Sequence, residues 1–159
     1  MRILGIDPGY ATVGFGITDY QGMDFRTVEY GAILTPAHTD FGGRLAQIYE
    51  DMCYLLDHYT PQAVSVEKLY FTNNKTTGIA VAEARGVILL ACAQRSVPVY
   101  EYTPLQVKSA VTGYGKAEKR QVMDMTRRIL HLAEIPKPDD AADALALAIC
   151  HGHCARPDY

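Results

Sequence analysis

The stretch RILGIDPGYATVGFGITDY, residues 2–20, decides the fold. It begins with a short apolar run that ends at Asp7, which predicts a buried strand with a carboxylate at its end. The Pro-Gly pair that follows suits the backbone angles of a tight turn. Residues 12–20 then form a second strand pattern, and residues 25–34 form a third. Because the connections are short, we expect the three strands to pair antiparallel.

The pattern changes after this meander. Apolar residues between 40 and 59 recur at three- and four-residue steps, which predicts an amphipathic helix. AVSVE, residues 63–67, is typical of a fourth strand, and we expect it to run parallel because a helix precedes it. The remaining elements are predicted as helix 76–94, strand 97–102, a short helix with Thr103 as its N-cap, a basic helix 116–132 and a final helix 140–153. This order predicts an α/β fold with a mixed sheet.

Composition favours a globular protein of one domain, residues 1–159. The chain has 159 residues, of which 48% are hydrophobic and 21% charged. From the sequence we expect that no apolar run approaches the ~20 residues needed to span a bilayer. We also expect no signal-peptide core at the N-terminus. We therefore expect a cytoplasmic protein with reduced, mostly buried cysteines. The tract CHGHC at 150–154 ends an apolar helix, which favours a structural role over a zinc site.

Charge is distributed unevenly along the chain. The net charge is −3, which alone argues against a nucleic-acid partner. Residues 68–128, however, hold 10 basic and 4 acidic side chains, whereas residues 1–67 hold 3 basic and 9 acidic ones. A basic middle between acidic ends favours a basic patch, although solvated helix faces would give the same count. Its candidate phosphate-binding residues are Lys108, Lys116, Lys119 and Arg120, with the start of a helix expected at Lys116.

Carboxylates stand at the ends of two predicted strands. Asp7 ends the first strand and Glu67 ends the fourth. If these strands are parallel neighbours, both side chains lie at one sheet edge, where open α/β sheets place their ligand sites. The last helix adds Asp140 and Asp143, which share a helical face. Asp139 lies one turn from Asp143 as well, but because it follows a proline we assign it to the N-cap and Asp140 to the site.

Four converging carboxylates repel one another unless cations hold them. An all-oxygen ligand set suits Mg²⁺ or Mn²⁺, and two such ions can support phosphodiester hydrolysis. Each acid taken singly also has an ordinary structural explanation, as a turn residue, a strand end or a helix N-terminal charge. Their joint placement favours a metal-dependent hydrolase with Asp7, Glu67, Asp140 and Asp143 as ligands.

These residues lie in blocks that resemble a known family. The blocks ILGIDPGYATVGFG, SVEKLYFTNN, EARGVILLA, VYEYTPLQVKSAVTGYGKAEKRQV and DDAADALALAICH resemble, in order and spacing, the RuvC-type Holliday junction resolvases, which are RNase H-like nucleases. The first block alone is weakly specific, since actin-like ATPases and sugar kinases have similar loops. GYGKAEKRQV and DAADALA are far more specific, and the resemblance covers nearly the whole chain.

The resemblance implies an RNase H-like mixed five-stranded sheet flanked by helices, a homodimer, and cleavage of four-way junction DNA with two Mg²⁺ ions per site, for which Mn²⁺ substitutes. It places the acidic site on the same four carboxylates and adds Lys119 and Lys108. It also implies that an aromatic residue, Tyr70 with Phe71 beside it, touches the junction. A RuvA–RuvB branch-migration complex is the implied partner.

Two alternatives stay open at this stage. One is an RNase H-like nuclease that acts on RNA or hybrid duplexes, and the other is a module that binds junctions without cutting them. The basic GKAEKRQV block speaks against the first, and the complete set of acids speaks against the second. For the dimer, the apolar helix 76–94 is the expected interface, through Ile79, Val87, Leu90, Ala80 and Ala91.

Overall fold

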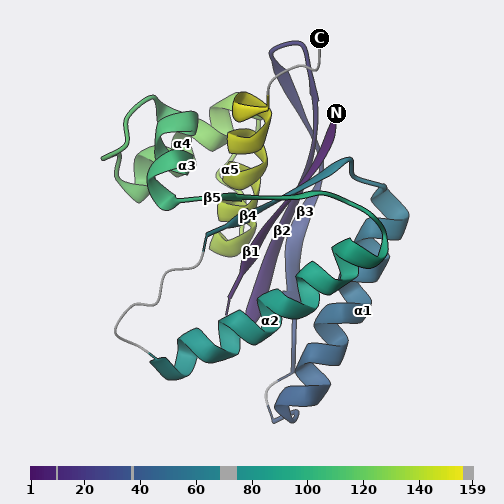
Figure 1. The fold of residues 1–159 in the computed structure, drawn as a ribbon. Helices are drawn as coiled ribbons and strands as arrows, with labels where there is room; N and C mark the ends of the chain where they lie inside the picture. The colour runs from purple at the N-terminus through teal and green to yellow at the C-terminus, as the bar shows by residue number, and fades with distance from the viewer. Residues whose placement is uncertain (10, 37, 69–74, 156–159) are drawn as a thin grey trace.

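The computed structural model describes residues 1–9, 11–36, 38–68 and 75–155 of the chain. Its centre is one five-stranded sheet, drawn in Figure 1. In chain order the strands are β1 (Arg2–Pro8), β2 (Thr12–Gln21), β3 (Asp24–Leu34), β4 (Ala63–Glu67) and β5 (Val99–Tyr102). Their order across the sheet is β3-β2-β1-β4-β5.

The sheet is mixed, as predicted from the lengths of the connections. β1 pairs antiparallel with β2, and β2 with β3. β4 lies parallel to β1 on its other side, and β5 continues parallel to β4. The first and fourth strands are therefore parallel neighbours, which is the arrangement on which the predicted site depends.

Two helices cover one face of the sheet, namely α1 (Phe41–Tyr59) and α2 (Lys75–Gln94). α1 begins after Asp40, whose carboxylate accepts a hydrogen bond from the Gly43 N–H at 2.9 Å. Its apolar stripe packs with α2 over alternate residues of the central strands. The core on this face includes Leu4, Ile6, Val64, Val66, Ile48, Met52, Leu55, Leu56, Ala84 and Ile88.

The opposite face is covered by α5 (Asp139–Cys154), with α3 (Pro104–Thr112) and α4 (Lys119–Ile129) packed against it. Figure 1 shows α5 lying across the sheet with α3 and α4 beyond it, on the side away from α1 and α2. A second apolar core joins these helices to β3, and it includes Phe25, Val111, Val122, Met123, Ala142, Leu145 and Ile149. Of the predicted acids, Asp7 lies in β1 and Glu67 in β4, whereas Asp140 and Asp143 belong to α5.

Two helix starts differ from their prediction. The basic helix begins at Lys119 rather than Lys116, because the Glu118 N–H donates to the Gln121 side chain at 2.8 Å and fixes the first turn there. The helix also ends at Ile129, before the expected residue 132. In the last helix Pro138 is the N-cap residue and Asp139 is already helical, so the assignment of Asp139 as the cap is wrong.

The helix α2 has the length and composition of a membrane span. Its segment Thr77–Gln94 has a mean hydropathy of 1.3 and is, by length and composition, able to cross a membrane. The expectation that no segment approaches such a span is therefore wrong. Ala91 was expected on the exposed side but is buried in the first core. The far side of the helix exposes Ile79 by 56% and Leu90 by 51%.

Candidate active site

The site begins at the ends of two strands. Ile6 of β1 lies opposite Val66 of the parallel strand β4, so the next residue of each strand, Asp7 and Glu67, stands at the same edge of the sheet. This is the juxtaposition predicted from the sequence. It follows from the parallel pairing alone, because equivalent ends of parallel strands meet at one edge.

Alternation along the strands decides which face the acids occupy. Ile6 and Val66 belong to the core under α1 and α2, so the residues before and after them point to the opposite face. On that face the Ser65 hydroxyl donates a hydrogen bond to the Leu147 carbonyl of α5 at 2.7 Å. Asp7 and Glu67 therefore share a face with α5.

Glycines in β1 and β2 let α5 approach the sheet closely. A Cβ on Gly5 would lie 1.9 Å from the carbonyl oxygen of Ala144, and one on Gly14 would lie 2.0 Å from the carbonyl oxygen of Asp140. No other residue type fits at these positions without moving the helix. The contact brings the first turns of α5, and with them two further acids, against the end of β1.

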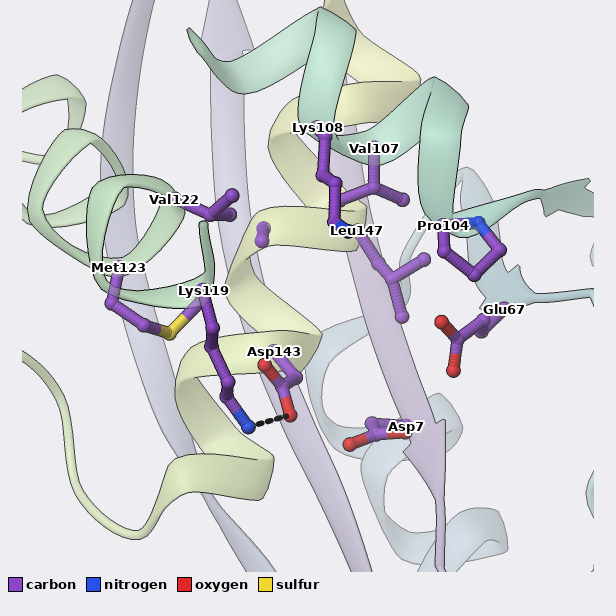
Figure 2. A pocket seen from close by; sticks show the side chains of 11 residues that line it. Asp7, Glu67, Pro104, Val107, Lys108, Lys119, Val122, Met123, Asp143 and Leu147 are labelled. Carbon is purple, nitrogen blue, oxygen red and sulfur yellow. Dashed lines mark hydrogen bonds and ion pairs between the residues drawn. The ribbon is translucent and has the colours of Figure 1, made fainter. Parts of the chain in front are cut away.

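The structure brings the predicted acids together. Carboxylate oxygens of Asp7, Asp140 and Asp143 lie within 4.8 Å of one another, and all three side chains are half-buried. Glu67 lines the same cavity as Asp7 and Asp143. Figure 2 shows Asp143 and Glu67 on either side of Asp7. Asp139, in contrast, is exposed to solvent.

Burial and mutual repulsion disfavour the charged forms of these acids. The pKa of Asp7 is raised to about 8, first by burial and then by Asp143, Glu67 and Asp140. Burial also raises the pKa of Glu67 and of Asp143. A divalent cation would remove this repulsion, and oxygen-only ligands suit hard cations. The residues therefore fit a metal site.

One lysine already neutralises part of this charge. Lys119, the first residue of α4, places its Nζ 3.5 Å from Oδ2 of Asp143. Asp143 raises the pKa of Lys119, so the ammonium form is favoured. Lys108 lines the cavity from α3, on the side away from Lys119 (Figure 2). Both lysines that the family resemblance singled out thus lie at the acidic cavity.

The other predicted DNA-binding residues lie elsewhere. Lys116 and Arg120 are exposed and do not line the cavity. Because Lys116 precedes the first turn of α4 by three positions, the phosphate site expected from a helix start there is wrong. Tyr70 and Phe71 lie outside the described residues.

The CHGHC tract contributes structural contacts. His151 is buried, and its Nδ1 lies 2.6 Å from the Tyr102 hydroxyl. Nδ1 of His153 lies 2.8 Å from the Ala110 carbonyl oxygen of α3. Cys92 and Cys150 are buried, whereas Cys154 is exposed. Within the described part of the chain, the carboxylates at the end of β1 form the group with metal-ligand geometry, and this tract does not.

The apolar residues that line part of the cavity were not predicted from the sequence. The cavity has a volume of about 290 Å³ and continues from the acids between α3, α4 and α5. Its apolar lining residues are Pro104, Val107, Val122, Met123, Ala146 and Leu147. Their helical spacing predicts core residues. No sequence signal distinguishes a core residue that borders a cavity from one that is packed on all sides.

Fold and acidic edge together define the class of protein, an RNase H-like nuclease. A structure of RuvC from Thermus thermophilus matches with a TM-score of 0.90 at 35% identity, covering 96% of this chain and 94% of that one. A second Thermus thermophilus RuvC structure, in complex with a Holliday junction substrate, matches at 0.93 and 35%, with coverage of 97% and 94%. The yeast mitochondrial Holliday junction resolvase Ydc2 shares the fold at 0.70 and 12% identity, with coverage of 95% and 77%.

Sequence comparison identifies the family. The family described as "Crossover junction endodeoxyribonuclease RuvC" matches residues 3–151. The RuvC protein of Brevibacillus brevis is 58% identical over 95% of this chain and 91% of its own length. That of Clostridioides difficile is 52% identical over 96% and 90%. The chain belongs to the RuvC family, whose members are nucleases that hydrolyse phosphodiester bonds of DNA.

Proposed function

We propose that this chain resolves Holliday junctions by paired, symmetric nicks, in the recombination and repair of DNA in the cytoplasm. One observation carries the proposal: the four acids converge at one sheet edge in a fold that superposes on a junction-bound RuvC with a TM-score of 0.93. As a further part of the proposal, residues 1–159 act as one nuclease domain.

We assign metal binding to the four acids. Glu67 and Asp143 lie on either side of Asp7 (Figure 2), and Asp140 belongs to the same carboxylate group as Asp7 and Asp143. This arrangement suits two Mg²⁺ ions, with Mn²⁺ able to substitute. When bound, such ions activate water and offset the charge of the leaving oxygen. The acids would hold these ions at the end of β1, where α5 keeps bulk water from one side.

The two lysines act on the DNA. Lys119, whose Nζ lies 3.5 Å from Oδ2 of Asp143, would neutralise a scissile phosphate brought to the acids. Lys108, on the other side of the cavity, binds a neighbouring phosphate. Lys116 and Arg120 extend the positive surface beyond the cavity.

A substrate panel tests this function. Purified protein with Mg²⁺ is mixed with a four-way junction, linear DNA duplex and an RNA–DNA hybrid of the same sequence. We expect cleavage of the junction and little of the other two. Preferential cutting of the hybrid would support the alternative RNase H-like activity, and tight junction binding without any cut would support the non-cleaving module.

Salt dependence tests the phosphate contacts. Despite the sequence pI of about 5.9, junction affinity is expected to fall steeply with salt, because released counterions dominate binding. Lys108→Ala and Lys119→Ala should each reduce the slope of log K against log salt by about 1. Arg26→Ala, on the distant edge strand β3, is the matched control and should leave the slope unchanged. A slope near zero for the native protein would contradict the basic surface.

A homodimer would supply two sites for two cuts, as the two-fold symmetry of a junction requires. The outer side of α2 supports this assembly. Five of its exposed positions recur at alternating steps of four and three residues, namely Ile79, Glu83, Gly86, Leu90 and Ala93. This spacing is that of a helix seam which packs against a second helix. A Cβ on Gly86 would meet nothing within 4 Å, so the middle of the seam is open to a close partner.

Leu90→Lys tests the seam. Because Leu90 is 51% exposed, the variant should keep its thermal stability, and a buried lysine at the interface should shift the protein to a monomer in sedimentation. It should nick junctions without completing paired cuts. Met23→Lys, at an 89% exposed position in the β2–β3 turn, is the control.

Mixed dimers of wild-type and Asp7→Asn chains should also nick one strand only. A monomer that makes both cuts would disprove the assembly.

Two family expectations complete the proposal. Tyr70 or Phe71 is expected to stack on a base at the crossover. The RuvA–RuvB branch-migration complex is the expected partner of the dimer, and we assign it no surface among the described residues.

A further inference from the structure

The four acids come from two layers of the fold. Asp7 and Glu67 stand on the sheet, at the ends of β1 and β4. Asp140 and Asp143 belong to α5, which covers that face of the sheet, and Figure 2 shows Asp143 on the helix with Glu67 across from it. A cation that binds acids of both layers needs the helix and the sheet at a fixed separation. Its affinity therefore depends on what holds α5 against the strands.

Charge repulsion acts against this separation in the metal-free protein. Burial first, and then the charge of Asp143, raises the pKa of both Asp7 and Glu67. The second effect is a repulsion between helix and sheet. Gly5 leaves room for the helix to approach, but it removes an obstacle and makes no bond. Apolar packing is non-directional, so a defined position of α5 on the strands needs hydrogen bonds.

Two hydrogen bonds join α5 to the strands beyond Asp143. On β4, the buried Ser65 hydroxyl donates to the Leu147 carbonyl oxygen at 2.7 Å. On β5, the Tyr102 hydroxyl lies 2.6 Å from Nδ1 of the buried His151. Leu147 and His151 follow Asp143 by four and eight residues, so the three positions share one face of the helix. Both contacts therefore lie in line with the acid.

The strands present these groups in line with Glu67 as well. Ser65 precedes Glu67 by two residues in β4, so both side chains point to the face that α5 covers. β5 runs parallel to β4, and Tyr102 is the register partner of Glu67. The tyrosine thus lies beside Glu67 on the neighbouring strand, and its hydroxyl reaches the helix that carries Asp143.

The contact between Tyr102 and His151 is a hydrogen bond between two neutral groups. Burial raises the pKa of Tyr102 to about 12 and lowers the pKa of His151. The phenol therefore keeps its proton and donates a hydrogen bond to the unprotonated Nδ1. The ring of Tyr100 packs on the histidine, with ring centroids 4.4 Å apart. Loss of one partner would leave a buried polar group unsatisfied, which favours a shift of the helix.

We propose that Tyr102 and His151 are positioning residues, whose hydrogen bond holds α5 at the separation from the sheet that a divalent cation requires. The Ser65 hydroxyl acts in the same way, one turn closer to the acids. This role rests on the metal binding assigned to the four acids under the proposed function, and deepens it. Both side chains act through α5 rather than on the cation, so their loss should lower metal affinity while the ligands stay intact.

Mn²⁺ binding to the protein alone measures this effect without cleavage. Free Mn²⁺ has a sharp electron paramagnetic resonance spectrum that broadens on binding, so a titration gives the Kd. Tyr102→Phe loses only the hydroxyl oxygen and should weaken binding about tenfold, the lower end of the ~10–100-fold measured for groups that orient metal ligands. Tyr100→Phe loses the same atom two residues earlier on β5, at an exposed position. It is the matched control and should bind Mn²⁺ as wild type does.

Substitution of the histidine separates the hydrogen bond from packing. His151→Leu fills a similar space but accepts no hydrogen bond, so it should weaken Mn²⁺ binding as Tyr102→Phe does. His151→Asn places an amide oxygen near the position of Nδ1 and should bind Mn²⁺ more tightly than His151→Leu. Ser65→Ala removes the second hydrogen bond with little change of volume and should also weaken binding. Circular dichroism at the titration temperature measures the folded fraction of each variant.

Junction cleavage gives a second readout that a merely structural role would not produce. In Tyr102→Phe protein the Mg²⁺ concentration for half-maximal cleavage should rise about tenfold, while the rate at saturating Mg²⁺ stays near that of wild type. Folded Tyr102→Phe and Ser65→Ala proteins with wild-type Mn²⁺ affinity would overturn the inference. So would equal losses in Tyr100→Phe and Tyr102→Phe, or His151→Asn that binds no tighter than His151→Leu. Wild-type protein that binds no Mn²⁺ would instead refute the metal assignment in the proposed function.

Discussion

Asp7→Asn is expected to lower junction cleavage by more than ~100-fold while junction binding survives or tightens. Residues that merely support a metal ligand already cost ~10–100-fold when replaced, and Asp7 lies at the centre of the cluster. The amide keeps the shape of the side chain but removes its charge, so repulsion toward the phosphate also falls. Single-turnover cleavage and a binding assay on one junction measure the two effects separately.

Two neighbouring acids provide the internal control. Asp140→Asn should resemble Asp7→Asn, because Asp140 belongs to the carboxylate group. Asp139→Asn should cut nearly as the native protein does, since Asp139 is exposed in the first turn of α5, where a charge contributes ~0.3–1 kcal/mol to stability. An inactive Asp139→Asn together with an active Asp140→Asn would reverse the assignment of these residues.

The metal-free protein is expected to lose stability as the pH rises from about 4 to about 8. The pKa of Asp7 is about 8 in the folded chain, against an ordinary value of 3.8. Between these values the unfolded chain has released this proton and the folded chain retains it, so rising pH favours unfolding. At ~1.4 kcal/mol for each pH unit between these two values, the cost is roughly 6 kcal/mol, or roughly 12–24 °C in Tm for a chain of this length.

Thermal unfolding in EDTA across this pH range measures the effect. Asp7→Asn should be more stable than wild type at pH 8 and nearly equal at pH 4. Mg²⁺ should raise the Tm of wild type more at pH 8 than at pH 5, since the cation needs the ionised acids. If wild type and Asp7→Asn showed parallel pH profiles without metal, Asp7 would not be a buried, repelled carboxylate.

The order of elements and the sheet were predictable because each depends on a local pattern. The alternation and short turns of residues 2–34 specify a meander, and a helix before β4 specifies a parallel return. From these two features the meeting of Asp7 with Glu67 follows. The first residues of α4 and α5 were not predictable, since they depend on which group caps the first turn. In α4 the Gln121 side chain accepts a hydrogen bond from the Glu118 N–H.

The close packing of α5 against the sheet could not be predicted from the sequence, for a different reason. The approach of α5 to β1 depends on Gly5, whose missing Cβ leaves room for the Ala144 carbonyl. A glycine in a strand gives no indication of which element approaches it. The same holds for Val107, which has the spacing of a core residue and nevertheless faces a cavity. Contacts between segments far apart in sequence decide both.

The most direct test of the central claim is to map the cuts on a four-way junction whose strands are labelled one at a time, with Mg²⁺ present. We predict one nick in each of two opposing strands at symmetric positions, ends that a ligase reseals, and no nicks with Asp7→Asn protein. Cuts scattered over all four strands, cuts in linear duplex at the same rate, or unchanged cutting by Asp7→Asn protein would contradict the account.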